Sequence, residues 1–177
     1  MDINQKLREA LENSKSSDNP EYDKFYKAML EHDSAFISAF RNKKEGFKDP
    51  KLNTGEEVTM EENMQNQSKL KSNLEKLGYM VIAGKGVYFG SAEDTFFVAD
   101  TNGDKDHFFG IIAKLGMKYN QDAILCVPAG GKGSFFYGTN YGEFPSFGKS
   151  SPLGDFADGE GKDGHTTIGG KSFHFGE

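Results

Sequence analysis

The chain has 177 residues and a mass of 19.6 kDa, a size that suits one domain with a core of its own. Its 27 acidic and 21 basic residues give a net charge of −6, and Arg8 and Arg41 are its only arginines. This balance argues against nucleic-acid binding through a basic surface. With 16 Phe and 7 Tyr the chain is also too aromatic to be disordered.

The cysteine content and the hydropathy pattern point to the cytoplasm. The single cysteine, Cys126, lies in the apolar run Ala-Ile-Leu-Cys-Val and can form no internal disulfide, which favours a reducing compartment. No stretch approaches the roughly 20 apolar residues of a membrane span, and the polar N-terminus does not resemble a signal peptide. We therefore expect a cytoplasmic protein, of a bacterium or of a virus-infected cell, that does not bind membranes.

The N-terminal third is predicted to be mainly helical. Residues 2–14 carry Ile3, Leu7 and Leu11 at helical spacing. Asn19 and Pro20 favour the start of a second helix. Its predicted apolar face consists of Tyr22, Phe25, Tyr26, Met29 and Leu30. The apolar segment 34–40 predicts a strand, and residues 42–58 predict a loop because they mix Gly, Pro, Asn and charge.

A third helix is predicted after Thr59. Thr59 and Glu62 have the spacing of a capping box, in which the hydroxyl and the carboxylate each bind an unpaired backbone N–H. Gly78 stands where a left-handed C-terminal cap is expected. The predicted buried face of this helix consists of Met60, Met64, Leu70, Leu74 and Leu77.

The second half is predicted to be richer in strands. We expect a hairpin of 79–83 and 87–89 around Gly-Lys-Gly, and a helix that Asp104 caps and Gly116 ends. Further strands are expected at 95–99, 123–127 and 134–138. These elements predict an α+β fold: a mostly antiparallel sheet of about five strands with helices packed on one face, preceded by an N-terminal helical pair. Within one domain we distinguish an N-terminal helical segment 1–33, a core 34–140 and a glycine-rich C-terminal extension 141–177.

The familiar catalytic and metal-binding motifs are incomplete. Residues 100–106 resemble the opening of a calcium loop, but Lys105 replaces its glycine and Ile111 its final glutamate. Residues 130–134 have the composition of a phosphate loop without its spacing or a following helix. The four histidines show no metal-ligand spacing, and Cys126 suits a core position. We therefore expect no catalytic residue, no metal and no cofactor.

Four polar residues border apolar segments, where a polar side chain tends to be partly buried: Arg41, Glu93, Gln121 and Asp122. We expect them to form a binding site, and a buried Arg41–Glu93 pair is the most specific hypothesis. A planar guanidinium can orient acids or phosphates, and it can equally tie a sheet edge to a loop. Both interpretations are open at this point.

Several segments resemble an uncharacterised family of small phage, plasmid and bacterial proteins. The resemblance lies in SAFISAFR (34–41), EENMQNQSKLKSNLEKLGY (61–79), EDTFFV (93–98) and LGMKYNQDAI (115–124). It covers residues 34–127. It implies a compact α+β domain of mobile-element or viral origin and brings no activity with it. The N-terminal helices and the glycine-rich extension depart from the family's pattern.

Two functional hypotheses follow. The first is a non-enzymatic, phage-type accessory protein that acts through a protein partner, as a host-takeover or anti-defence factor or as a minor virion component. Aromatic side chains and glycine loops favour protein interfaces. The alternative is a small hydrolase or transferase acting on a nucleotide-like substrate, with Arg41, Glu93 and Gln121 around a pocket. The oligomeric state is left open.

Overall fold

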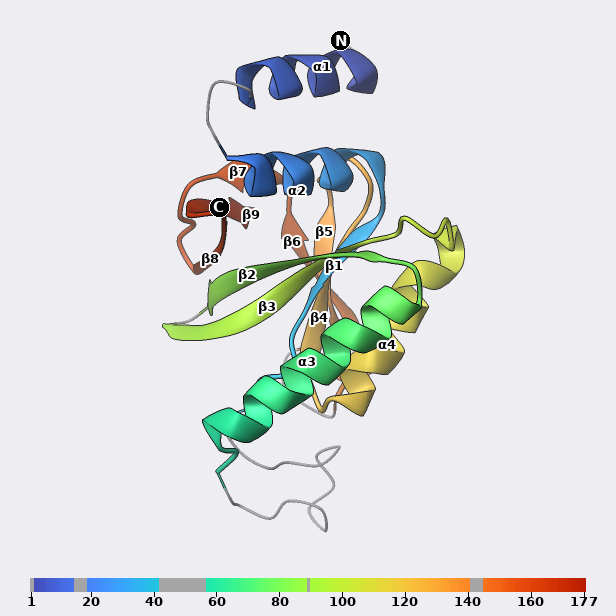
Figure 1. Ribbon diagram of the computed structural model, residues 1–177, viewed down its shortest axis with the longest axis vertical. Helices are drawn as coiled ribbons and strands as arrows, with labels where there is room; N and C mark the ends of the chain where they lie inside the picture. Colours follow the sequence, from blue (N-terminus) through green and yellow to red (C-terminus); the bar gives the residue numbers. More distant parts are fainter. Residues whose placement is uncertain (1, 15–18, 42–56, 89, 141–144) are drawn as a thin grey trace.

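A computed structural model describes residues 2–14, 19–41, 57–88, 90–140 and 145–177 (Figure 1). Over these ranges the elements are α1 (Ile3–Ser14), α2 (Pro20–Glu31), β1 (Ser34–Ile37), α3 (Met60–Lys76), β2 (Met80–Tyr88), β3 (Ser91–Ala99), the 3-10 helix η1 (Lys105–His107), α4 (Phe108–Lys118), β4 (Ala123–Val127), β5 (Ser134–Gly138), β6 (Ser150–Gly154), β7 (Phe156–Asp158), β8 (Gly164–Ile168) and β9 (Lys171–Phe175). The strands form one sheet in the order β6-β5-β4-β1-β3-β2-β8-β9-β7.

The α+β prediction, with about five strands and helices on one face, is wrong. The described residues form a nine-stranded sheet in which neighbouring strands pair antiparallel. Its edge strands β6 and β7 are joined by Asp155 alone. The sheet must therefore curl until its two edges approach, as in a nearly closed barrel. Hydrogen bonds across this seam run from Phe156 N to Gly131 O at 2.7 Å and from Gly133 N to Asp155 Oδ1 at 2.9 Å.

Helix α2 covers one face of the sheet with aromatic side chains. Phe25 is fully buried and stacks on Phe173 of β9 with ring centroids 4.4 Å apart. It also meets Phe97 of β3 edge-on at 4.8 Å. One side chain of α2 therefore contacts both β3 and β9, the last strand along the chain. Helix α1 lies beyond α2 (Figure 1), where half-buried Leu7 packs against this cluster.

Helices α3 and α4 cover the opposite face, so helices lie on both sides of the sheet (Figure 1). Leu70 and Leu74 of α3 and Phe108 and Ile112 of α4 are fully buried in this second cluster. Gly116 does not end α4, which continues to Lys118. A side chain at Gly116 would come within 3.0 Å of Ile124 and Thr139. The glycine thus allows close packing of helix on strand.

The predicted hairpin around Gly-Lys-Gly is also wrong, because β2 runs unbroken from Met80 to Tyr88. Its whole length pairs with β3, and Lys85 stands opposite Asp94. At Gly84 an added Cβ would lie 3.0 Å from Ile168 and from the Thr167 carbonyl of β8. The glycine inside the strand therefore permits close approach of β8 and does not mark a turn.

Two further predictions need correction. Asp104 makes no side-chain cap; the Asp100 carboxylate instead accepts from the backbone N–H groups of Asp104 at 2.9 Å and Lys105 at 2.8 Å. The C-terminal extension, for which no elements were predicted, supplies strands β6–β9. By contrast, the cap at Thr59 is confirmed, since its hydroxyl accepts from Glu62 N. Most of the predicted loop 42–58 lies outside the described residues.

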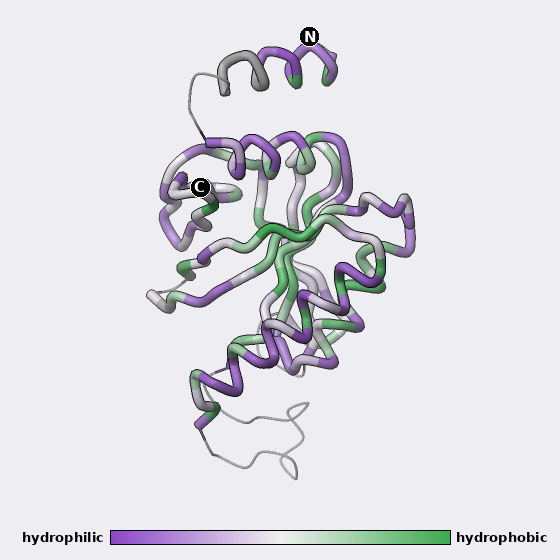
Figure 2. The backbone as a smooth tube through the Cα atoms, viewed as in Figure 1, coloured by the Kyte–Doolittle hydropathy of each residue, from purple (hydrophilic) through white to green (hydrophobic). Residues whose placement is uncertain are grey.

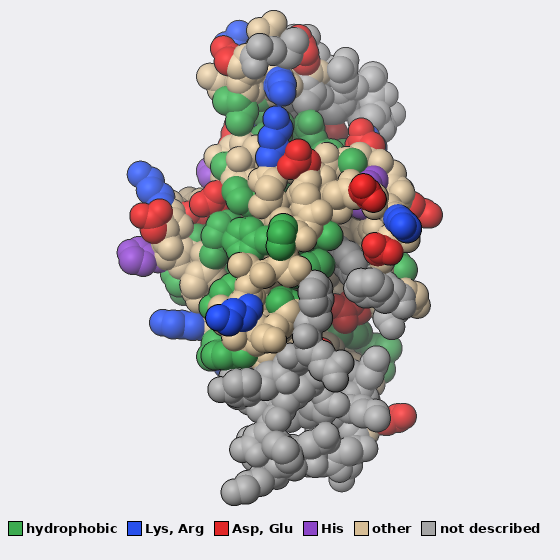
Figure 3. Space-filling view, turned by 180° about the vertical axis from the view of Figure 1, so that it is seen from behind, with side chains coloured by type: hydrophobic (Ala, Val, Ile, Leu, Met, Phe, Trp, Pro, Cys, Tyr) green, Lys and Arg blue, Asp and Glu red, His purple; other side chains and the backbone are tan. Residues whose placement is uncertain are grey.

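Hydrophobic and hydrophilic residues are unevenly distributed over the molecule. Hydrophobic residues concentrate in the strands at the centre of the molecule, whereas helices α1 and α3 carry many hydrophilic positions (Figure 2). From behind, hydrophobic side chains gather in the middle of the face, with acidic side chains scattered around them (Figure 3). In the part of the chain that the structure describes, none of the helices has the length and apolarity needed to cross a membrane.

Candidate functional site

The segment after β1 is held by side chains from neighbouring elements. β1 ends at Ile37, and the Ser38 hydroxyl then donates to the Asp94 carbonyl of β3 at 2.6 Å. The Ala39 N–H donates to the Gln67 Oε1 of α3 at 2.8 Å. Gln121 Nε2 donates to the Phe40 carbonyl at 3.1 Å. The chain leading to Arg41 is thereby fixed between α3, β3 and the segment before β4.

Arg41 forms an ion pair with Asp122. Its Nη1 lies 3.3 Å from Asp122 Oδ1, and 17% of the arginine side chain is exposed compared with 47% of the aspartate side chain. Asn63 holds the backbone of the same arginine, because the Arg41 N–H donates to Asn63 Oδ1 and Asn63 Nδ2 donates to the Arg41 carbonyl, both at 2.9 Å. Arg41 is thus held at its backbone by Asn63 and at its guanidinium by Asp122.

Glu93 adds a second carboxylate to this end of the sheet. The residue is exposed, so the buried Arg41–Glu93 pair suggested by the sequence is not formed. Nearby protein atoms still desolvate its carboxyl in part, which raises its pKa. The positive charge of Arg41 acts in the opposite direction, and the charges of Asp122 and Asp94 raise the pKa further. Glu93 therefore lies in the electrostatic field of both members of the ion pair.

The four residues predicted from the sequence are thus brought to one end of the sheet. The partner that the structure gives Arg41 is Asp122, whereas the sequence suggested Glu93, which acts on it through its charge. The Gln121 side-chain amide donates to the backbone carbonyls of Phe40 and Tyr119. The backbone carbonyl of Gln121 accepts from the Thr139 hydroxyl. Their role in binding stays a prediction.

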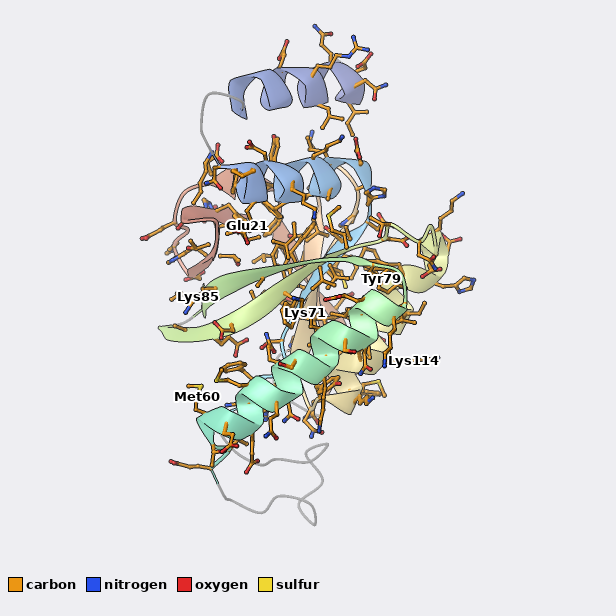
Figure 4. All side chains as sticks on the ribbon, viewed as in Figure 1. Glu21, Met60, Lys71, Tyr79, Lys85 and Lys114 are labelled. Carbon is orange, nitrogen blue, oxygen red and sulfur yellow. The ribbon has the colours of Figure 1, made fainter. Side chains whose placement is uncertain are left out.

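A groove of about 480 Å³ lies near this cluster. The four predicted residues do not line it, but Gln67 and Asp94 do, and both bind the segment that leads to Arg41. α3 forms one wall and the β2–β3 hairpin the floor; in Figure 4, Lys85 lies on the hairpin and Met60 at the start of α3. At its rim Lys85 Nζ lies 3.7 Å from Asp94 Oδ1. The lining residues are Gln67, Ala83, Gly84, Lys85, Asp94, Thr95, Phe96, Thr167, Gly169 and Gly170. The groove is mostly apolar with a few polar groups, as small-molecule sites are.

The predicted buried face of α3 is confirmed at Leu70 and Leu74 and wrong at its other three positions. Met60, Met64 and Leu77 are 64%, 60% and 40% exposed, whereas Asn63 and Gln67 are buried together with Leu70 and Leu74. Positions 63, 67, 70 and 74 share one face of a helix. The sequence contained this spacing, but two amides at its start look like surface residues until their backbone partners are known.

Other candidate groups are less suited to chemistry. Burial raises the pKa of the Cys126 thiol to about 12, so the thiol stays protonated and is a poor nucleophile. Over the described ranges, no three His, Cys, Asp or Glu side chains lie close enough to hold a metal ion together.

The sequence model of the S-adenosylmethionine lyase family matches residues 54–175, which is more than half of the chain. A search of curated proteins found no match. Glu93, Gln121 and Asp122 lie inside the matched segment, whereas Arg41 precedes it. A family-level domain was expected, but the match extends beyond the predicted 34–127 and carries the name of an enzyme.

The hypothesis of a non-enzymatic accessory protein is therefore wrong. An interaction protein was favoured because no complete catalytic motif is present in the sequence, and the matched family is named for a lyase. The alternative hydrolase or transferase belongs to a different reaction class. The protein partner and the cytoplasmic location stay predictions.

Proposed function

The chain belongs to the S-adenosylmethionine lyase family, and we propose that it breaks a carbon–sulfur bond of S-adenosylmethionine without adding water. The family match carries this proposal. We assign the broken bond to the one between the sulfonium sulfur and the γ-carbon of the amino-acid chain. The ion pair and the nearby groove support binding of the substrate, because they offer separate places for its amino-acid half and its adenosyl half.

The reaction needs little from the protein beyond positioning and charge. A sulfonium is a good leaving group, since its sulfur takes the bonding electron pair and becomes a neutral thioether. As the carbon–sulfur bond breaks, either an oxygen of the substrate's own carboxylate attacks the γ-carbon and closes a lactone, or a base removes a β-proton and leaves an alkene. Atoms and charge balance in both cases without a redox partner. Orientation of the amino-acid chain is the main requirement.

Arg41 suits the substrate's α-carboxylate. A guanidinium presents five N–H donors in a planar fork, so contact with Asp122 through Nη1 is compatible with a second carboxylate. Its backbone is clamped by Asn63, which limits the motion that substrate binding would otherwise have to arrest. We therefore assign Arg41 to orientation of the amino-acid half.

Glu93 suits the cationic sulfonium. In its ionised form the carboxylate would attract the positive sulfur, and it could also accept a β-proton. Desolvation raises its pKa, and a group with a raised pKa is a better proton acceptor once ionised. The nearby groove of about 480 Å³ then has room for the adenosyl half.

The test is turnover of S-adenosylmethionine in water enriched in oxygen-18, with products followed by mass spectrometry. We expect a thioether and a four-carbon fragment without heavy oxygen on its γ-carbon. A hydrolase would place heavy oxygen there. Hydrolysis of a lactone after release normally breaks the acyl bond, so its heavy oxygen goes to the carboxyl group and the two reactions stay distinguishable.

A matched pair of variants assigns the reaction to this site. Glu93→Gln should lower kcat/KM by about 100-fold, as loss of one preorganised charged group does. Glu9→Gln makes the same chemical change at an exposed position on α1, which lies on the far side of α2 from the sheet (Figure 1), and should leave the rate unchanged. Absence of turnover in the unaltered protein would refute the proposed reaction, and equal rates for the two variants would refute the site.

A further inference from the structure

Two buried amides on α3 lie where a helix normally places apolar side chains. Asn63 is 6% exposed and Gln67 is 8% exposed, and the same face continues with fully buried Leu70 and Leu74. Burying an amide is costly unless its polar atoms are hydrogen-bonded. The partners of these two amides should therefore indicate what they do.

Both amides bind the backbone of the segment that leads to Arg41. Gln67 Oε1 accepts from the Ala39 N–H at 2.8 Å. One helical turn earlier, Asn63 binds both the N–H and the carbonyl of Arg41, each at 2.9 Å. α3 thus supplies hydrogen bonds to alternate residues of an extended chain, as a neighbouring strand would.

The opposite side of the same segment is held independently. The Ser38 hydroxyl donates to the Asp94 carbonyl, and the Phe40 carbonyl accepts from Gln121 Nε2. Residues 39 and 41 therefore bind α3, whereas residues 38 and 40 bind β3 and Gln121 on the other side. Asn63 fixes both peptide groups that flank the Arg41 Cα. This fixes the direction in which the arginine side chain leaves the backbone.

We propose that Asn63 is a positioning residue for Arg41, with Gln67 supporting the preceding turn of the same chain. The inference rests on the proposed function in so far as Arg41 orients the substrate's carboxylate. Asparagine is specific for this role because it offers a donor and an acceptor at the same reach. Aspartate would keep the acceptor and lose the donor, and alanine would lose both.

The first test compares Asn63→Ala with Asn66→Ala. Asn66 lies three residues further along α3, and its side chain makes no hydrogen bond to a residue that the structure describes. Both changes alter helix propensity equally. We expect Asn63→Ala to lower kcat/KM for S-adenosylmethionine about tenfold, with both a higher KM and a lower kcat, because a displaced guanidinium binds the substrate's carboxylate less well and no longer orients it. Asn66→Ala should match the unaltered enzyme.

A double-mutant cycle separates positioning from general structural support. If Asn63 acts through Arg41, adding Asn63→Ala to Arg41→Ala should have no further effect on kcat/KM. A residue that merely supports the fold would make the double variant worse by the same factor as the single one, and that result would overturn the inference. If Asn63→Ala does not fold, Asn63→Asp takes its place in the same cycle, with a smaller fall in kcat/KM expected.

A second readout does not depend on turnover. The charge of Arg41 lowers the pKa of Glu93, so displacement of the guanidinium should raise that pKa. Carbon-13 NMR titration of labelled glutamate, assigned with Glu93→Gln, should show a higher Glu93 pKa in Asn63→Ala than in Asn66→Ala. Identical titration curves would overturn the positioning role even if the proposed reaction were correct. A displaced curve would support it even in a protein without turnover.

Discussion

The face under α2 and the sheet end beside Arg41 are built from different interactions. Under α2, Phe25, Phe97 and Phe173 are completely buried, and the ring of Phe25 contacts the rings of the other two. Beside Arg41, the buried groups are amides and hydroxyls, and each contact is a hydrogen bond to backbone or an ion pair. The same sheet therefore carries an apolar face under α2 and a polar region beside Arg41.

The aromatic face under α2 and the polar region beside Arg41 contribute differently to stability. Burial of an aromatic ring removes a large apolar area from water, whereas a net hydrogen bond contributes only about 0.5–1.5 kcal/mol. A polar region is thus an inefficient way to stabilise a fold. The precise geometry of the polar region instead suits the orientation of a ligand. Variants under α2 should therefore change mainly stability, and variants beside Arg41 mainly activity.

Phe25→Ala is expected to have the largest effect. Loss of this buried ring should lower the free energy of unfolding by about 3–5 kcal/mol, because a cavity is left among rings that cannot close it. Urea denaturation measures the loss. The activity of the molecules that remain folded should be unchanged. If Phe25→Ala kept full stability and lost activity, the proposed division between the stabilising face under α2 and the polar region beside Arg41 would be contradicted.

Arg41→Ala is expected to act in the opposite way. We expect kcat/KM for S-adenosylmethionine to fall about 100-fold, equivalent to about 2.7 kcal/mol. The free energy of unfolding should fall by at most about 1 kcal/mol, since the partner Asp122 is half exposed. Arg8→Ala, on the exposed surface of α1, is the matched control and should alter neither quantity.

Asp100→Ala tests whether every polar cluster in the molecule serves activity. Its carboxylate binds two backbone N–H groups in the turn after β3, and the residue is buried. We expect a loss of about 1–3 kcal/mol in the free energy of unfolding, because both N–H groups lose their partner. Kinetic constants should stay within about twofold. A large fall in kcat would show that this turn also contributes to activity.

The pH dependence gives the finest distinction. Glu93 has a raised pKa, and only its ionised form attracts a sulfonium. Activity should therefore be present above this pKa and be lost as the pH falls through it. In Arg41→Ala the acid limb of kcat/KM should move to higher pH, because a positive charge that lowers the pKa of Glu93 is gone. A limb that moves to lower pH would show that another group titrates.

The sequence predicted elements whose pattern is local. The aromatic face of α2 and the cap at Thr59 are examples, since each depends on residues within one or two helical turns. Arg41, Gln121 and Asp122 were recognised because polar residues border apolar segments there. Their convergence required the antiparallel pairing of β1 with both β3 and β4, which no local pattern specifies.

The errors have a common physical origin in distant contacts. Asn63 and Gln67 are buried only because residues 39–41 lie against them. Met60 and Met64 looked like core residues from their chemistry, yet they lie on the exposed side of α3. The strands of the C-terminal extension contain Ser, Gly and Pro and are weakly patterned, so pairing with β2, with β5 and with one another determines their structure.

The contact between Phe25 and Phe173 has a consequence for the order of events during synthesis. The aromatic face of α2 leaves the ribosome early, but β9, which covers part of it, is among the last segments made. Until then β2 also lacks its partner β8. A chain of this topology holds exposed rings and an open strand edge through most of its translation, and such species aggregate readily. We expect its yield in cells to depend more on elongation rate and chaperones than the stability of the finished protein would suggest.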